Sequence, residues 1–403
     1  MIRIIKWAGI CCLLLLTSWI GWRSYNYFFD ETAPVIEVVG LSEGGYYAGD
    51  LHTVITGSDA YKVATISVWL DQRSIVTNYK INARTFEQPL PIPTRTIPDG
   101  KHVLRIEAVD AAYNRHQTSQ EINFFVDNKP LQAAFVRPET EQKVFQGRTF
   151  HVQFQVNKPI KVATVHALSR EFSCHQESQN SPVYECFIPV SCEEAPNEYP
   201  FTITIEDRVG NNLVLDGKFQ IMAFPFKKQQ LYSINTEKFA KERELGREQQ
   251  ELATLMAQAI AESPAEKLWH GIFYVPINMT GMVCEFGTKR ISQEKGFYIH
   301  DALDLVAPLK SVVWAPQDGK VVVKDRFAFT GNTVVIDHGF GVLTMLCHLD
   351  SFATDLQVGK MIRRGTPVGR MGRTGYATGD HLHWELCVGT VKVDPMQWTK
   401  SDF

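Results

Sequence analysis

The distribution of hydrophobic and polar positions divides the chain into four zones. An unbroken apolar run, Trp7 to Trp22, contains no charged residue. From residue 31 to about 224, short runs of alternating apolar and polar residues are separated by turn signals, which predicts β-strands. Helical spacing replaces this alternation between residues 236 and 262, and alternation returns over the last third of the chain. The pattern therefore predicts a mainly β protein with an N-terminal helix and a helical linker.

The N-terminal apolar run has the features of a signal anchor. Arg3 and Lys6 precede it, and its length of about 16 residues is slightly short for a relaxed transmembrane helix. The bulky Trp19 and Ile20 lie where a cleaved signal peptide needs small residues, which favours an uncleaved anchor over a cleaved signal. Positive charge is greater before the run than after it. We therefore expect residues 1–30 to cross the inner membrane once, leaving the bulk of the chain periplasmic or otherwise extracytoplasmic.

Two stretches of about a hundred residues repeat one pattern. Asp110 ends a strand-like alternation and is followed by Asn114, and the same arrangement returns 97 residues later at Asp207 and Asn211. A period near one hundred residues matches a β-sandwich rather than a solenoid repeat. The strand and its turn resemble immunoglobulin-like (Ig-like) modules of bacterial surfaces. Neither copy gathers catalytic residue types, so we expect two Ig-like sandwiches that act as spacers or bind an envelope partner, at residues 31–126 and 127–224.

The helical zone carries an amphipathic stripe. Its apolar residues recur at intervals of three, four or seven: Leu245, Leu252, Leu255, Met256 and Ile260. Because no heptad is sustained, the stripe is expected to pack on a neighbouring domain rather than on a partner helix. Ser263, Pro264 and Glu266 then form the pattern of a capping box and predict a short second helix. Residues 225–270 are assigned to this linker and 271–403 to the last domain.

Composition and charge add limits to this picture. Of the 403 residues 44% are hydrophobic and the formal net charge is −3, which excludes wholesale disorder and gives no electrostatic reason to expect a nucleic-acid partner. Cys174, Cys186 and Cys192 lie close together in the sequence, which fits either one disulfide outside the cytoplasm or three buried or free thiols. No Cys-x-x-Cys pair occurs, which argues against a structural zinc knuckle.

Chemistry-bearing residues gather in the last third of the chain. His300 and Asp304 are four residues apart, so their side chains share one side of a strand or a helix. His381 and His383 alternate with apolar neighbours and therefore point to one face of a strand. His348 lies between these pairs, at the end of another alternating run. Imidazole and carboxylate groups are suitable zinc ligands, although either pair alone could arise by chance.

The joint arrangement resembles the lysostaphin/LytM-type zinc metallopeptidases. His-x-x-x-Asp, a single His after a strand and a C-terminal His-x-His occur in the order of that family. Further similar segments extend the resemblance over roughly residues 280–398: Phe286 to Arg290, Val313 to Val322, Gly331 to Gly339 and Gly372 to Gly375. Ala302 stands where the family usually has glycine, and Asp380 where it often has proline. Neither departure removes a ligand.

The resemblance implies an antiparallel, barrel-like peptidase domain of the duplicated hybrid type that holds one Zn²⁺. The implied ligands are His300, Asp304 and His383, with the fourth position left to water. The resemblance assigns proton transfer and oxyanion stabilisation to His348 and His381 without dividing the two roles. It further implies a metalloendopeptidase that cuts stems or cross-links of bacterial peptidoglycan. Oligoglycine bridges and D-alanyl–diamino acid cross-links are both open as the bond cut.

Two functions from other classes compete with this hypothesis. A LytM-like domain that has lost catalysis could activate a separate cell-wall amidase by binding it. The three ligands and the two further histidines are all present here, which favours an active hydrolase. Alternatively, the two sandwiches could carry the main function as a surface-binding module.

Overall fold

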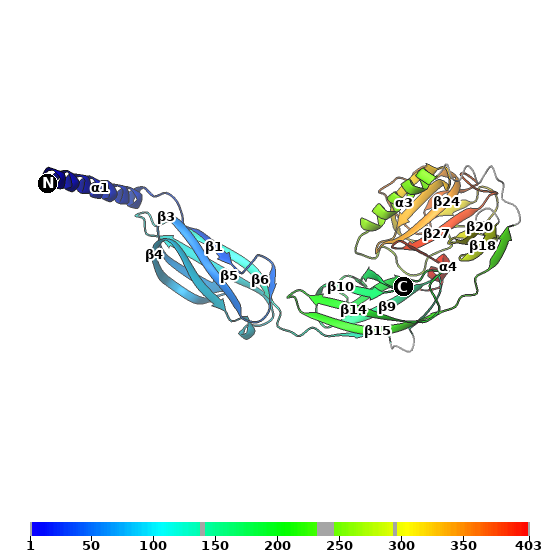
Figure 1. Cartoon of the computed structure of the whole chain (residues 1–403), viewed down its shortest axis with the longest axis horizontal. Coiled ribbons are helices and arrows are strands. Elements are labelled where there is room, and N and C mark those ends of the chain that lie inside the picture. Colours follow the sequence, from blue (N-terminus) through cyan, green and yellow to red (C-terminus); the bar gives the residue numbers. More distant parts are fainter. Residues whose placement is uncertain (1, 138–141, 232–245, 293–295, 402–403) are drawn as a thin grey trace. The chain divides into compact units, whose positions relative to one another are not determined.

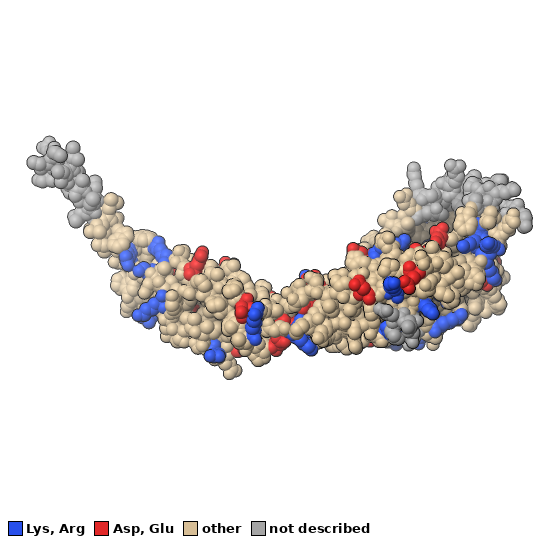
Figure 2. Space-filling view, turned by 60° about the horizontal axis from the view of Figure 1, so that its bottom comes forward, with Lys and Arg blue, Asp and Glu red and all other residues tan. Residues whose placement is uncertain are grey.

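The computed structural model describes residues 2–137, 142–231, 246–292 and 296–401. The chain forms two compact units. The first contains Met1–Pro130 with Arg208–Asn211, and the second contains Leu131–Asp207 with Asn212–Phe403. Both are built mainly from β-strands, as the alternating pattern predicts (Figure 1). Charged side chains of both signs are interspersed over the face shown in Figure 2.

Helix α1 (Ile2–Phe29) contains the apolar N-terminal run. Its side chains are described only from Leu14 onward, so the predicted anchor lies partly outside the described residues. In the part of the chain that is described, no helix is both long and apolar enough to cross a membrane. The membrane anchor stays a prediction.

The first unit contains a single six-stranded sheet. Its strand order is β1-β3-β5-β6-β2, with β4 paired to β3. Strands β3 and β4 are 20 residues long, and β3 pairs with β1 through its first half and with β5 through its second half. The long hairpin of β3 and β4 joins the strands of this unit into one hydrogen-bonded sheet, and the predicted sandwich stays a prediction here. The strands are β1 (Val35–Val39), β2 (Gly45–Tyr47), β3 (Leu51–Leu70), β4 (Arg73–Ile92), β5 (Gly100–Asp110) and β6 (Gln117–Val126), with a 3₁₀ turn at Thr94–Thr96.

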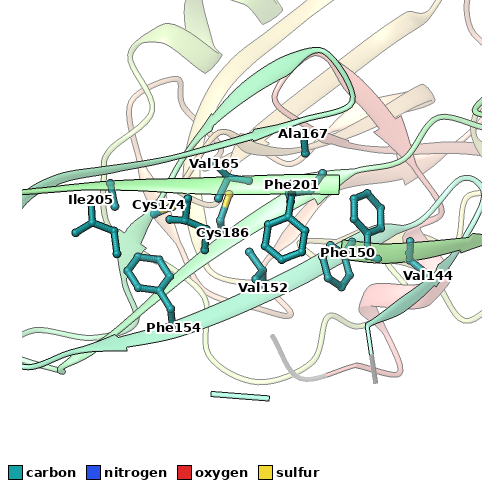
Figure 3. Close-up of a cluster of buried hydrophobic side chains, with 14 of the residues drawn as sticks. Val144, Phe150, Val152, Phe154, Val165, Ala167, Cys174, Cys186, Phe201 and Ile205 are labelled. Carbon is teal, nitrogen blue, oxygen red and sulfur yellow. The ribbon is translucent and has the colours of Figure 1, made fainter. Parts of the chain in front are cut away.

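The second unit begins with two sheets around one core. Their strand orders are β11-β10-β14-β15-β8 and β12-β13-β9-β7. Phe150, Phe154 and Phe201 point into the space between the sheets and pack there with Cys174 and Cys186 (Figure 3). The Ig-like assignment of either repeat stays a prediction. The strands are β7 (Ala133–Phe135), β8 (Lys143–Phe145), β9 (Thr149–Val156), β10 (Ile160–Ala167), β11 (Arg170–Ser173), β12 (His175–Gln176), β13 (Val183–Pro189), β14 (Glu198–Asp207) and β15 (Asn212–Met222).

The sequence repeat has a counterpart in strand register. Val63 is paired with Asp110 in the first copy, and Ile160 is paired with Asp207 in the second. In both copies the register shifts immediately after this pair, as at a β-bulge. The 97-residue offset therefore relates equivalent positions of two similar strand pairs.

The last domain is organised around a ten-stranded sheet with the path β17-β20-β27-β24-β23-β22-β25. All pairs within it are antiparallel, in agreement with the expected class. A second sheet joins β16, β18 and β19. The elements are β16 (Lys228–Leu231), α3 (Gly246–Ala261), β17 (Gly281–Cys284), β18 (Thr288–Ser292), β19 (Gly296–His300), β20 (Leu303–Val306), β21 (Val312–Trp314), β22 (Gly319–Phe327), β23 (Gly331–Asp337), β24 (Val342–Phe352), β25 (Met361–Ile362), β26 (Pro367–Met371), β27 (Leu382–Val388), β28 (Val391–Val393) and α4 (Pro395–Trp398).

Helix α3 covers one side of this sheet. Leu252 and Ala259 are buried against a cluster that includes Val335 and Leu343, so the stripe packs on a neighbouring domain as predicted. Leu245 lies outside the described residues. The predicted second helix at Ser263 is wrong, because the chain is not helical there.

The Ser263 hydroxyl is used in a tertiary contact instead of a helix cap. It donates to Oδ1 of Asp337 at 2.7 Å and accepts from the amide of Gly341 at 2.9 Å. A local capping signal has therefore been overridden by a contact with the β23–β24 turn.

The second repeat is packed directly on the last domain. Phe187 of β13 lies 5.6 Å, centroid to centroid, from both Trp269 and Trp398. The backbone of Thr149 receives and donates hydrogen bonds with the Gln397 amide, at 2.7 and 2.8 Å. Cys192 belongs to the same buried cluster as Leu303 and Trp384 of the ten-stranded sheet.

Six cysteines beyond helix α1 are free and buried. They are Cys174, Cys186, Cys192, Cys284, Cys347 and Cys387. Of the two options left open by the sequence, the structure therefore shows buried free thiols rather than a disulfide.

Candidate active site

Strand pairing aligns the candidate ligands across the ten-stranded sheet. Along the neighbours β17, β20, β27 and β24, the paired residues are Cys284 with Asp304, Asp304 with His383, and His383 with Cys347. Residues directly opposite each other on antiparallel strands project from the same face. His300, the last residue of β19, joins this row from the second sheet. Five separate strands thus build one site.

Asp304 is the centre of the arrangement. Its Oδ1 lies 2.9 Å from Nδ1 of His383 and 3.6 Å from Nε2 of His381, and its Oδ2 lies 3.2 Å from Nε2 of His300. The residue is 7% exposed. Burial alone would raise the pKa of this carboxyl, but His300 and His383 outweigh burial and hold the pKa far below its usual range. Asp304 is therefore a permanent anion among three histidines.

His383 is held between two carboxylates. Its Nδ1 faces Asp304, and its Nε2 lies 2.9 Å from Oε1 of Glu385. Burial would lower the pKa of His383, but these hydrogen bonds and charges raise it to about 9. Glu385 in turn accepts from Nζ of Lys392 at 2.8 Å, and Lys392 and His383 overcome the effect of burial to lower the pKa of Glu385 to about 2. A carboxylate that fixes the outer nitrogen of a metal-binding imidazole is a recurrent arrangement in metalloproteins.

His348 reaches the site through an irregular backbone. Its φ is 61°, in the left-handed region, and the register of β24 against β23 is interrupted there. In a regular strand His348 would face away from the side of Cys347. Instead its ring lies 4.8 Å from that of His381 and 5.8 Å from that of His383.

Two glycines allow the loops beside His348 to approach closely. Gly331 and Gly375 have φ of 68° and 74°, and a Cβ on either would collide with backbone of the other loop. Between these loops the carbonyl of Thr374 lies 2.9 Å from Nδ1 of His348, and that of Thr330 accepts from the His348 amide at 2.9 Å. The glycine motifs therefore hold the histidine in place.

The hydrogen-bond partners of His348 and His381 determine which ring nitrogen of each residue carries a proton. Nδ1 of His348 contacts the carbonyl of Thr374, and Nδ1 of His381 contacts the carbonyl of Gly379 at 2.9 Å. A carbonyl only accepts, so Nδ1 carries a proton in each ring, and in the neutral form of either ring the lone pair is on Nε2. Burial, helped by His383 and His381, lowers the pKa of His348 to about 4. Its imidazole is therefore neutral at neutral pH.

The donor set fits a zinc ion. Nε2 of His300 is buried and makes no well-aligned hydrogen bond, although Oδ2 of Asp304 lies 3.2 Å away. Such an orphaned nitrogen beside the Asp304 carboxylate and the Nδ1 of His383 is explained by a cation that takes all three donors. The structure thus brings together His300, Asp304 and His383, with His348 and His381 next to them.

Cys284 is a donor that sequence reasoning missed. Its sulfur, a His300 nitrogen and an Asp304 oxygen lie within 4.8 Å of one another. Glu385 and Lys392 were also missed as parts of the site, although Glu385 follows His383 in the alternation that predicts the strand. No spacing rule joins Cys284 to His300, because the proximity arises from the pairing of β17 with β20.

His338 lies in the turn after β23 and has a structural role. It is fully buried, with Nδ1 2.7 Å from the carbonyl of Asp318 and Nε2 2.9 Å from the hydroxyl of Thr344. Burial lowers its pKa to about 4.

Comparison with known proteins places this site in a defined family. Residues 298–395 match the model of Peptidase family M23, a span that contains His300, Asp304, His348, His381 and His383. The part of the chain that carries the site is thus a peptidase M23 domain.

Two curated relatives match the same part of the chain. Peptidoglycan DD-endopeptidase ShyB of Vibrio cholerae is 35% identical over 113 residues, which cover 28% of this chain and 26% of the relative. DD-carboxypeptidase/endopeptidase Mpg of Neisseria meningitidis is 33% identical over 121 residues, which cover 30% and 27%. The chain thus spans about a quarter of the length of the curated relatives that it matches.

Among solved structures, a peptidase M23 from Pseudomonas aeruginosa is similar to this chain. The sequence identity is 21% and the TM-score is 0.46. The match covers 63% of this chain and 94% of that one.

Proposed function

We propose that the C-terminal domain is a zinc-dependent endopeptidase that hydrolyses peptide bonds of bacterial peptidoglycan. The observation that carries this proposal is the grouping of Asp304 with three histidines within 3.6 Å, with His348 alongside. The match to peptidase family M23 and the names of the relatives support the same reaction class.

Three residues would hold the zinc ion, and the remaining positions would stay open to water and substrate. His300 would bind through its orphaned Nε2, His383 through Nδ1, and Asp304 through its carboxylate. When bound, zinc supplies a Lewis acid that activates water near pH 7 and polarises the scissile carbonyl. Glu385 keeps the other nitrogen of His383 protonated, which leaves Nδ1 available as a ligand.

His348 and His381 would perform the proton transfers. Both present an Nε2 lone pair, because their Nδ1–H groups donate to carbonyls. His348 is neutral at working pH and can take a proton from the attacking water. The protonated imidazole of either residue can then stabilise the oxyanion or protonate the leaving amine. Reversed roles for the two histidines are equally compatible with these contacts.

The substrate proposed here is a D,D-peptide cross-link. The two relatives are named for DD-endopeptidase and DD-carboxypeptidase/endopeptidase activity, which favours this bond over an oligoglycine bridge. Such a substrate requires a position outside the cytoplasm. We accordingly keep the proposal of a single N-terminal anchor in the inner membrane, which is based on the apolar run and on Arg3 and Lys6 before it.

The direct test is digestion of purified sacculi by the full-length protein. We expect about one zinc per chain and release of products cleaved at D,D-cross-links, identified by mass spectrometry. Zinc content near zero, or an unchanged muropeptide profile with zinc bound, would contradict the hydrolase. In the second case, stimulation of a wall amidase by the same protein would support the non-catalytic alternative.

Variants separate catalysis from metal binding. His348→Ala and His381→Ala should keep zinc and lose about 100- to 10,000-fold in turnover, the usual contribution of general acid–base groups. His383→Ala should lose zinc and activity together. The matched control is His270→Ala, which replaces an exposed histidine just before the domain and should change neither quantity.

A further inference from the structure

Three carboxylates converge in the first unit, far along the sequence from the peptidase domain. Asp30 directly follows the end of helix α1, Asp59 lies in β3, and Asp110 is the last residue of β5. One oxygen from each lies within 4.8 Å of the other two. Three separate segments of the chain thus bring acidic groups to one point.

Local hydrogen bonds satisfy one oxygen of Asp30 and one of Asp59. Oδ1 of Asp30 accepts from the amide and hydroxyl of Thr32, and Oδ1 of Asp59 accepts from the amides of Tyr61 and Lys62. The Oδ2 atoms of both residues are buried and have no hydrogen-bond partner. Burying a carboxylate oxygen without a hydrogen-bond partner costs free energy, and the cost is larger for two such oxygens beside a third carboxylate.

The surroundings supply little compensating charge. Asp110 is fully buried, accepts from the amide of Ala112 and lies 3.0 Å from Nδ1 of His116. The 7% exposure of Asp30 leaves it nearly sealed from solvent. Burial, together with the negative charges of Asp30 and Asp110, raises the pKa of Asp59. The cluster therefore has an excess of negative charge.

In the second copy of the repeat, a lysine offsets the negative charge of the equivalent aspartate. Asp207 is equivalent to Asp110 by strand register, and it lies 2.7 Å from Nζ of Lys158. Both side chains are buried. By the same register, the position of Lys158 is taken in the first copy by Tyr61, which has no charge. The second copy therefore has a cationic side chain beside its aspartate, and the first copy has none at the equivalent position.

We propose that Asp30, Asp59 and Asp110 form a Ca²⁺ site that joins the end of helix α1 to the first β unit. All donors are oxygens, which suits Ca²⁺. Two ligands of one ion are separated by at most twice the metal–oxygen distance, about 5 Å for Ca²⁺ and about 4 Å for Mg²⁺. The three carboxylate oxygens lie within 4.8 Å of one another, which is close enough for one Ca²⁺ ion to bind all three.

Binding would stabilise the junction between the helix and the sheet. Asp30 is the first residue after helix α1, and the carbonyl of Tyr27 in that helix already accepts from the amide of Tyr113 at 2.9 Å. An ion shared by Asp30, Asp59 and Asp110 adds a second link between the same segments. This inference is independent of the proposed peptidase activity.

Terbium luminescence tests the site on the full-length protein. Tb³⁺ takes oxygen ligands as Ca²⁺ does, and the cluster is close in sequence to Tyr27, Tyr61 and Tyr113, whose rings lie about 6 Å apart. We expect tyrosine-sensitised Tb³⁺ emission that Ca²⁺ abolishes at concentrations at least about tenfold lower than Mg²⁺. Equal competition by Mg²⁺, or no sensitised emission and no thermal shift with Ca²⁺, would overturn the assignment to calcium.

Two variants and one control localise the ion. Asp59→Asn should weaken Ca²⁺ binding at least about tenfold, whereas Asp50→Asn, which removes an exposed carboxylate of the same unit, should leave it unchanged. Tyr61→Lys copies the second repeat and should remove the gain in melting temperature on adding Ca²⁺ while the unit stays folded. If Asp59→Asn and Tyr61→Lys both keep the Ca²⁺ response of the native chain, the site is elsewhere and the proposal fails.

If Asp59→Asn does not fold, Tyr61→Lys and the native chain still decide the question. A folded Tyr61→Lys variant that binds Ca²⁺ as tightly as the native chain would count against the site.

Discussion

The two β repeats share a strand register and differ in what surrounds it. Each ends its central strand on a buried aspartate opposite a β-bulge, at Asp110 and Asp207. In the first repeat that aspartate meets two further carboxylates, and in the second it meets Lys158. The comparison shows that a repeat conserves a backbone arrangement while its buried charge can be neutralised in different ways.

The repeats also differ in what they pack against. The first belongs to its own compact unit, whereas the second shares a unit with the peptidase domain. Cys192 of the second repeat lies in one buried cluster with Leu303 and Trp384 of the peptidase strands. Phe187 lies among Trp269, Phe340 and Trp398. The second repeat therefore belongs to the same packed unit as the M23 domain.

The largest effect is expected from breaking that packing. Phe187→Ala should lower the free energy of unfolding of the second unit by about 4 kcal/mol, because it removes a buried aromatic ring and leaves a cavity. Thermal unfolding and sacculus digestion should decline together. The matched control is Phe124→Ala, a buried ring of the first unit, which should leave the transition that inactivates the peptidase unchanged. Loss of the second repeat's fold with a fully stable peptidase would contradict shared folding.

A smaller effect should follow from removing the lysine that distinguishes the repeats. Lys158→Met leaves Asp207 buried without its ammonium partner and should cost about 3 kcal/mol, within the range for broken buried ion pairs. Adding Asp207→Asn to that variant should restore much of the loss. Urea unfolding of the single and double variants measures both values, and equal stability of the two would refute the charge argument.

The smallest expected effect is a difference between the two units in how the free energy of unfolding changes with pH. His338 of the second unit has a pKa near 4 when folded and about 6.5 when unfolded, so the unfolded chain binds the proton first as pH falls. Its contribution is complete above pH 6.5 and is lost towards pH 4. The loss between pH 7 and pH 5 should be about 2 kcal/mol.

His102 of the first unit should behave in the opposite way. Although burial lowers its pKa, Asp71 raises the pKa of this imidazole overall. The contribution of His102 to stability is therefore present below pH 6.5 and is lost as pH rises through the folded pKa.

Urea unfolding of the native chain and of His338→Gln at pH 5 and pH 7 checks the sign of the His338 effect. A variant with the same pH dependence as the native chain would show that His338 is not responsible.

Sequence reasoning selected the five histidine and aspartate residues that the structure brings together. His-x-x-x-Asp and His-x-His are local patterns, so their spacing is visible in the sequence. Cys284 and Lys392 could not be found in this way, because their positions depend on strand pairing and on a side-chain hydrogen bond. The left-handed backbone that turns His348 towards the site is likewise absent from the alternation pattern.

Two expectations met features that local sequence does not show. The capping pattern at Ser263 was overridden because its hydroxyl binds the β23–β24 turn. The first repeat formed one sheet because β3 and β4 continue through both halves. Local sequence does not show how far a strand continues after a bulge. It also does not show which distant group forms a hydrogen bond with a given hydroxyl.

The sequence by itself determined the β-rich character, the period of the repeat and the identity of the candidate zinc ligands, because alternation and short spacings are local properties. Only the tertiary structure decided which nitrogen of each histidine faces Asp304, which carboxylates share a site, and which repeat packs on the peptidase. These features depend on contacts between residues far apart in the chain. Asp110 and Asp207 occupy equivalent positions of the repeat, and only the folded structure shows that Lys158 lies beside Asp207 and that Asp30 and Asp59 lie beside Asp110.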